Sequence, residues 1–188
     1  MDMQATRSLP VPQAQAWAAL NNAEVLKSCI PGCDKFEPSG DHQYQVGVAI
    51  KIGPVAAKFS GTVQLKDIVV PTSYALQFDA QGGMVGFGKG ECQVLLTPTD
   101  SGCDLQYTVH SKVGGKLAQL GQRLIDGAAK SLTEDFFTRF EAALAQQFSS
   151  EPMAQAAPVS AKSAKTAWPL WVGGAVVLVG VLGFFWLR

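Results

Sequence analysis

The chain has 188 residues, 47% of them hydrophobic, and it carries 15 basic and 15 acidic side chains. A chain of this length can build one domain with a substantial core and a short appendage. A net charge of zero argues against a protein that coats nucleic acid with a basic surface, so we expect no nucleic-acid partner.

The first ten residues contain no apolar run of the length that a secretory signal needs. The chain has four cysteines, which could form two disulfides in an oxidising compartment. Without a signal, we expect a cytoplasmic domain whose thiols stay free.

The first elements are short. Residues 3–9 predict a strand that ends at the turn Pro10-Val11-Pro12. Apolar residues at helical spacing predict two helices in tandem, at 13–20 and 23–29. Ile30-Pro31-Gly32-Cys33 follows as a turn.

From there the apolar residues alternate, which is typical of half-buried strands. After a short strand at 35–37, five more strands follow, joined by tight turns. Their expected inner faces are Tyr44, Val46, Val48, Ile50 and Ile52; Phe59, Gly61, Val63 and Leu65; Tyr74, Leu76, Phe78 and Ala80; Gly88, Gly90, Cys92, Val94 and Leu96; and Cys103, Leu105, Tyr107 and Val109.

The last element of this part is a long helix that ends at Phe148. Apolar residues recur in steps of three and four, at Leu117, Leu120, Leu124, Ala128, Leu132, Phe136, Phe140, Leu144 and Phe148. A helix of 32 residues would be roughly 48 Å long, so a sheet must cover its stripe. The element order predicts an α+β helix-grip fold, in which a curved seven-stranded antiparallel sheet closes on the C-terminal helix.

Alternate turns of such a sheet lie at the same end. One set of turns is polar, whereas the other is apolar and rich in glycine: residues 53–55, 82–87 and 113–115. Lysines surround the second set, at positions 51, 58, 89, 112 and 116.

Two interpretations of this end stay open. It can be a portal of flexible apolar loops that touch a membrane, with lysines near anionic headgroups. Alternatively, three hairpins use glycine and carry ordinary solubilising lysines. The small residues of the inner face, such as Gly61, Gly88 and Gly90, leave room for a cavity, although glycine also lets a sheet bend.

The C-terminal part has a different composition. Residues 149–167 are rich in Ala, Ser, Pro and Gln and predict a flexible linker. Residues 168–187 contain no charge and have tryptophans near both ends, so they predict a transmembrane anchor about 30 Å long. Lys162 and Lys165 precede this span, and the positive-inside rule then keeps residues 1–148 in the cytoplasm.

The sequence offers no catalytic constellation. His42 lies beside a polar turn and His110 falls on the outward phase of its strand. Cys29 and Cys33 have no second pair to complete a zinc site. We therefore predict no catalytic residue, no metal ligand and a protein that is not an enzyme.

The residues around the turns Pro10-Val11-Pro12 and Ile30-Pro31-Gly32-Cys33 resemble those of one family. Leu9-Pro10-Val11-Pro12, Trp17, Leu20 and, most specifically, the run 24–33 with Cys29-Ile30-Pro31-Gly32-Cys33 are similar to the carbon monoxide dehydrogenase G subunit (CoxG) family, of the START/Bet v 1-like (SRPBCC) superfamily. The strand 44–53 and Phe59-Ser60-Gly61 are similar to it too, and the resemblance covers about residues 3–148.

This resemblance implies a helix-grip domain with an elongated hydrophobic cavity and a role beside molybdenum-containing hydroxylases such as carbon monoxide dehydrogenase. It implies attachment of such an enzyme to the cytoplasmic membrane. Transport of a lipid quinone, menaquinone or ubiquinone, is also consistent with the resemblance. The family has no known catalytic residues that could be assigned to positions of this chain.

Three hypotheses follow: a tethered carrier that recruits the enzyme and binds a quinone, a pure anchor without ligand, and a cyclase or hydrolase on the same fold. For the carrier, we expect a helix wall, a sheet wall and a lip at the portal. These are Leu117, Leu120, Gly121, Leu124 and Ala128; Phe59, Phe78 and Tyr107; and Met84, Val85 and Phe87.

Overall fold

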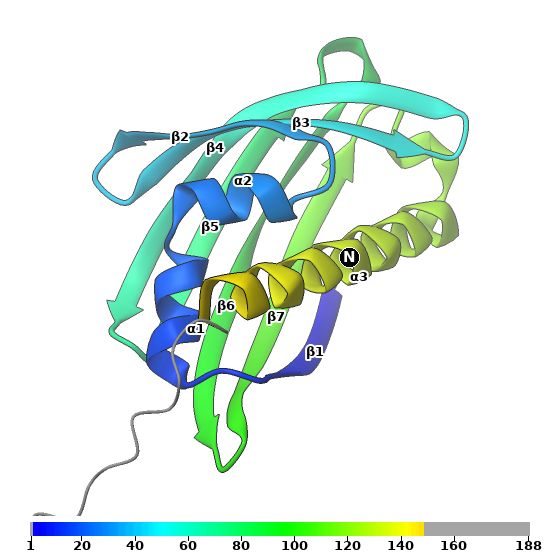
Figure 1. The fold of residues 1–188 in the computed structure, drawn as a ribbon. Helices are drawn as coiled ribbons and strands as arrows, with labels where there is room; N and C mark the ends of the chain where they lie inside the picture. Colours follow the sequence, from blue (N-terminus) through cyan, green and yellow to red (C-terminus); the bar gives the residue numbers. More distant parts are fainter. Residues whose placement is uncertain (1, 149–188) are drawn as a thin grey trace, which may run out of the picture. The chain divides into compact units, whose positions relative to one another are not determined.

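The computed structural model describes residues 2–148, which form one sheet, two short helices and one long helix (Figure 1). In chain order the elements are β1 (Asp2–Leu9), α1 (Gln13–Leu20), α2 (Ala23–Cys29), β2 (Cys33–Gly40), β3 (Gln43–Ile52), β4 (Val55–Val69), β5 (Ser73–Gln81), η1 (Gly83–Val85), β6 (Phe87–Thr99), β7 (Gly102–Gly114), η2 (Ala118–Leu120) and α3 (Gln122–Phe148).

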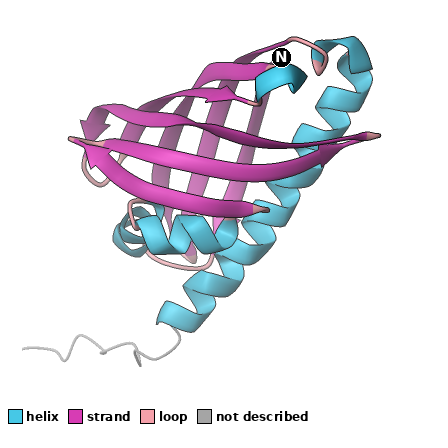
Figure 2. Ribbon diagram, turned by 90° about the horizontal axis from the view of Figure 1, so that it is seen from above, coloured by secondary structure: helices cyan, strands magenta, loops and turns pink. Residues whose placement is uncertain are grey.

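All neighbouring strands of the sheet are antiparallel. The spatial order is β1-β7-β6-β5-β4-β3-β2, so β2 to β7 form a meander and β1 returns beside β7. The sheet curves around α3, as Figure 2 shows from above. The predicted α+β fold, with seven antiparallel strands and a long C-terminal helix, is confirmed.

Local sequence signals set the first helices. Helix α1 begins after Pro12, and Asn22 caps α2 because its Oδ1 accepts hydrogen bonds from the backbone N–H groups of Glu24 and Val25 at 3.0 and 3.3 Å. Strand β2 extends further in both directions than the predicted strand 35–37.

The long helix differs from the prediction at its start. Gly121 has φ of +87°, a left-handed value that separates the single turn η2 from α3. Helix α3 therefore has 27 residues and a length of about 40 Å. In the first turn of α3, Ile125 is buried and Leu124 is 49% exposed.

The main core lies at the end of α3 that is far from η2. The largest fully buried side chains are Phe140, Leu96, Leu144, Cys29 and Cys103. Aromatic contacts extend this core, with Trp17 edge-on to Tyr74 and Tyr107 stacked on Phe137, both pairs having centroids 5.6 Å apart. Helices α1 and α2 cover this end of the sheet (Figure 1).

A second, smaller cluster lies at the opposite end, where the glycine-rich loops gather. Its buried members are Ile52, Phe59 and Leu117. The backbone N–H of Leu117 donates to the Val85 carbonyl at 2.9 Å, and Gly86 and Gly115 are in such close contact that a Cβ on Gly115 would lie 2.5 Å from the Gly86 Cα. Two of the loops at this end, residues 82–86 and 114–117, are therefore fixed to one another.

None of the helices between residues 2 and 148 is both long and apolar enough to span a membrane. The predicted linker, residues 149–167, and the predicted transmembrane anchor, residues 168–187, lie outside the described residues.

Candidate functional site

A cavity of about 310 Å³ lies between the sheet and the middle of α3. Its walls come from β1, β3, β6, β7, the end of α1, the turn after α2 and α3. The lining residues are Met3, Leu20, Ile30, Pro31, Val48, Ile50, Cys92, Val94, Leu105, Tyr107, Val109, Leu132, Thr133, Phe136 and Phe137.

The alternation of the strands positions this lining. Val94 on β6 faces inward in register with Tyr107 on β7, and both side chains are buried. Helical spacing places Leu132 and Phe136 in one row of α3 and Thr133 and Phe137 in the adjacent row, and both rows face the cavity. The result is a floor of sheet side chains with an apolar helix above it.

The cavity lining carries no charged side chain. Its polar atoms are the Tyr107 hydroxyl, the Thr133 hydroxyl, which donates to the Ala129 carbonyl at 2.9 Å, and the Cys92 thiol. Burial raises the pKa of Tyr107, and the nearby Arg7 opposes this shift. Within residues 2–148 the Tyr107 hydroxyl has no hydrogen-bond partner, so it is available to an oxygen of a ligand.

Burial also raises the pKa of the Cys92 thiol from 9.0 to about 11. We expect alkylation of Cys92 in the native protein to be about 100-fold slower at neutral pH than in the unfolded chain, because the thiolate is the nucleophile. Labelling with iodoacetamide over a pH series, followed by peptide mass spectrometry, measures this rate.

The native rate should still rise between pH 9 and 11; a plateau near pH 9 would contradict the expectation. Because the pKa in the folded protein exceeds that in the unfolded chain, the thiol's contribution to stability is complete below about pH 9 and is lost as the pH rises toward 11.

Of the eleven residues predicted to bind a ligand, Tyr107 alone lines this cavity. Phe59 and Leu117 are buried in the second cluster, against which Val85, Leu120 and Ala128 pack. These five residues thus lie together at the loop end of the sheet.

The remaining predicted residues have other surroundings. Met84 is 84% exposed and Leu124 is also exposed, so the expectation that Leu124 faces inward from the helix is wrong. Gly121 ends η2 instead of lying inside the long helix. The Phe78 ring covers Gly90, and the Phe87 ring covers Gly114.

The inner-face glycines therefore do not all leave empty space. A Cβ at Gly90 would lie 2.9 Å from the Phe78 ring, and one at Gly61 would lie 2.0 Å from the Asp79 carbonyl oxygen. At Gly88 nothing lies within 4 Å. The cavity lies between the sheet and the middle of α3, whereas Gly61 and Gly90 permit close packing and curvature of the sheet.

Most residues that the site prediction missed already stood in the sequence patterns. Val48, Ile50, Cys92 and Val94 belong to the predicted inner faces, and Leu132 and Phe136 belong to the helical stripe. No pattern in the sequence indicated how far along the helix the cavity lies. Ile30 and Pro31 were predicted as a turn, without a role in binding.

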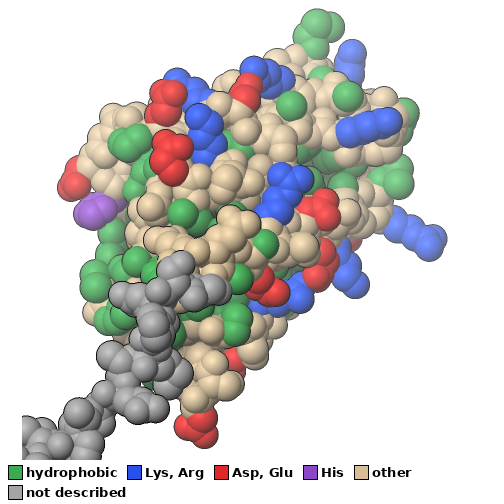
Figure 3. All heavy atoms as spheres, in the orientation of Figure 1, with side chains coloured by type: hydrophobic (Ala, Val, Ile, Leu, Met, Phe, Trp, Pro, Cys, Tyr) green, Lys and Arg blue, Asp and Glu red, His purple; other side chains and the backbone are tan. Residues whose placement is uncertain are grey.

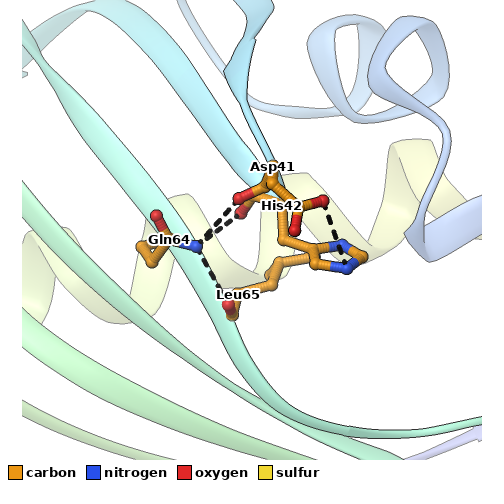
Figure 4. Close-up of polar contacts among 4 residues, drawn as sticks. All are labelled: Asp41, His42, Gln64 and Leu65. Carbon is orange, nitrogen blue, oxygen red and sulfur yellow. Dashed lines mark hydrogen bonds and ion pairs between the residues drawn. The ribbon is translucent and has the colours of Figure 1, made fainter.

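The histidines lie on the surface, as predicted. His42 is exposed in the turn between β2 and β3, where the side-chain amide of Gln64 donates to the carbonyls of Asp41, His42 and Leu65 at 3.2 to 3.3 Å (Figure 4). His110 Nδ1 lies 2.7 Å from Asp2 Oδ1.

A second hollow, of about 690 Å³, lies on the outer face of the sheet and includes His110, Asp79, Lys89, Glu91 and Lys112. Between residues 2 and 148, no group of three or more His, Cys, Asp or Glu side chains is placed to hold a metal ion. The apolar cavity between the sheet and α3 is therefore the better candidate for a ligand site.

The loop end combines exposed apolar and basic side chains. The five lysines predicted there are all exposed, and Lys58 forms an ion pair with Asp34. In Figure 3, Lys and Arg side chains gather at the upper right beside exposed hydrophobic side chains.

A curved antiparallel sheet that closes on a C-terminal helix around an apolar cavity defines a helix-grip protein of the Bet v 1-like type. The chain is similar in structure to TTHA0849 from Thermus thermophilus (13% identity, TM-score 0.60, 79% of this chain and 99% of that chain). It is also similar to Ara h 8.0201 (17% identity, TM-score 0.57, 78% of this chain and 98% of that chain). At these identities the likeness shows the fold alone.

The chain belongs to the carbon monoxide dehydrogenase G subunit (CoxG) family, whose model matches residues 6–145. A conserved protein from Geobacillus kaustophilus is 32% identical, with a TM-score of 0.74 over 78% of this chain and 97% of that chain. No curated protein sequence matched. Membership of the family implies an accessory role to carbon monoxide dehydrogenase.

Proposed function

We propose that this protein recruits a molybdenum-containing hydroxylase of the carbon monoxide dehydrogenase type to the cytoplasmic membrane and holds part of a lipid quinone in its cavity. Residues 168–187 would anchor it in the membrane, with residues 1–148 in the cytoplasm. The protein itself is not a catalyst in this proposal: it presents the quinone to the enzyme, which exchanges electrons with the headgroup.

The observation that carries the proposal is the cavity between the sheet and α3. Its volume, about 310 Å³, is at the lower end of the range of about 300 to 1,000 Å³ for small-molecule pockets, so it suits a segment of an isoprenoid tail. Each Å² of apolar surface that leaves water contributes about 25 cal/mol. Burial of a few hundred Å² of tail would therefore offset much of the cost of leaving the bilayer.

The polar atoms of the cavity suit a ligand with few oxygens. The Tyr107 hydroxyl can donate to a quinone carbonyl, and no charged side chain in the lining would have to lose its water. Either menaquinone or ubiquinone meets these requirements.

The test uses residues 1–148, which contain the whole sheet and core, and whose matched relative from Geobacillus kaustophilus consists almost entirely of this fold. The purified protein is incubated with vesicles that contain menaquinone or ubiquinone and re-isolated, and its lipids are identified by mass spectrometry. Cys92→Trp fills the cavity, whereas Leu124→Trp introduces the same indole at an exposed position.

We expect bound quinone on the wild type and on Leu124→Trp, and at least tenfold less on Cys92→Trp. In the full-length chain, Cys92→Trp should still bring the enzyme to the membrane fraction. If the wild type carries neither quinone nor any other lipid, the protein is a pure anchor and the carrier proposal is wrong.

A further inference from the structure

The position of the second cluster bears on how a ligand reaches the cavity. On three elements, a member of this cluster lies nearer the loop end than a cavity residue does: Ile52 follows Val48 on β3, Val113 follows Val109 on β7, and Ala128 precedes Leu132 on α3. Packed side chains thus lie between the glycine-rich loops and the cavity.

Side-chain contacts bridge β1 and α3 on the side of the cavity next to β1. Arg7 is on the inward phase of this edge strand and forms an ion pair with Glu134 of α3. Its guanidinium also lies 5.3 Å from the centre of the Phe137 ring, within the range of a cation–π contact. These contacts join the edge of the sheet to the helix beside the cavity.

The opposite side has no such bridge. Among residues 2–148, no hydrogen bond or ion pair joins α3 to β2 or β3. In Figure 1, α3 runs below β3 and continues to the right, past the C-terminal end of α2. The cavity residues on this side are half-buried and apolar, and they form what we call the lateral mouth: Ile30, Pro31, Val48, Ile50, Leu132 and Phe136.

One rim of the lateral mouth is a rigid turn. The backbone N–H of Cys33 donates to the Ile30 carbonyl at 3.1 Å, and Gly32 has φ of +72°, as expected of a type II turn with proline before glycine. The Ala49 N–H donates to the Gly32 carbonyl at 2.9 Å, which fixes the turn to β3. This turn is the sequence run that carries the family resemblance.

We propose that apolar ligands enter and leave the cavity through the lateral mouth, between the turn at Ile30-Pro31 and α3, and not through the glycine-rich loops. This inference rests on the proposed function, since it describes the route to the same cavity. Because no polar contact spans the mouth, a small outward movement of α3 breaks only apolar contacts. An isoprenoid or other aliphatic chain can replace those contacts as it passes.

The experiment measures the association rate of a neutral apolar fluorophore, N-phenyl-1-naphthylamine, with residues 1–148 by stopped flow. Ile30→Trp and Val48→Trp add bulk at the lateral mouth. Val85→Trp and Val113→Trp add the same bulk at the loop end, and all four positions are half-buried. Circular dichroism and the melting temperature verify that each variant is folded.

We expect at least one mouth variant to slow association tenfold or more, while the folded loop-end variants stay within twofold of the wild type. Slower association in the loop-end variants, or equal slowing at both ends, overturns the lateral route. Those results leave the quinone carrier intact, provided that the wild type binds the fluorophore. A wild type that binds neither the fluorophore nor quinone overturns both proposals together.

Discussion

Replacing Phe140 by alanine is expected to lower the free energy of unfolding by about 3 to 5 kcal/mol. Phe140 is completely buried and stacks on Phe136, with ring centroids 5.6 Å apart. It belongs to the main core that joins α3 to the sheet and to α1. Removal of the ring loses its apolar contacts and leaves a cavity that the surrounding rings and strands can fill only in part.

Urea unfolding of residues 1–148, followed by circular dichroism, measures this effect. Met84→Ala is the control, since this side chain is 84% exposed and its loss should change stability by less than about 0.5 kcal/mol. A loss below about 1 kcal/mol for Phe140→Ala would mean that the main core rearranges far more freely than its packing indicates.

Gly32→Ala should also cause a large loss, of about 3 kcal/mol, through two effects. The left-handed backbone at φ of +72° is strained for alanine. A Cβ would also lie 2.1 Å from the Ala49 carbonyl oxygen, so the turn and β3 would have to separate. The same urea experiment gives the loss.

Gly127→Ala is the matched control for this substitution. Gly127 lies in α3, and a Cβ added there would meet no atom within 4 Å. Alanine there should stabilise the protein by about 0.5 to 1 kcal/mol, because glycine loses more backbone freedom in a helix. Equal effects at the two positions would contradict the strain and the close contact inferred at Gly32.

The sequence was sufficient for the order of elements, because the apolar residues of most strands alternate and those of the two short helices recur at helical spacing. It was insufficient for the start of α3. The apolar spacing of Leu117, Leu120 and Leu124 continues the stripe of α3, but spacing carries no information about the left-handed φ of Gly121. Gly121 ends η2, so α3 begins only at Gln122, and Leu124 in its first turn is exposed.

The site was harder to predict than the fold for a related reason. Periodicity predicts which side chains face the interior, so Tyr107 was correctly placed on the inner face. Whether an interior position is filled depends on contacts distant in sequence. Phe78 occupies the space beside Gly90, and the interior is open instead beside Thr133, between the sheet and the middle of α3.

The largest fully buried side chains of residues 2–148 include none that lines the cavity: Phe140, Leu96, Leu144, Cys29 and Cys103. Leu20, Val94, Leu105, Tyr107 and Phe137 belong both to the main core and to the cavity wall. Ile30, Pro31, Val48 and Leu132 line the cavity but lie outside that core, so substitutions at these four positions are largely uncoupled from the residues on which folding depends most. Such a division lets one scaffold acquire a different ligand preference by few, individually tolerated mutations. It also makes this chain a suitable starting point for engineering a carrier of other apolar molecules.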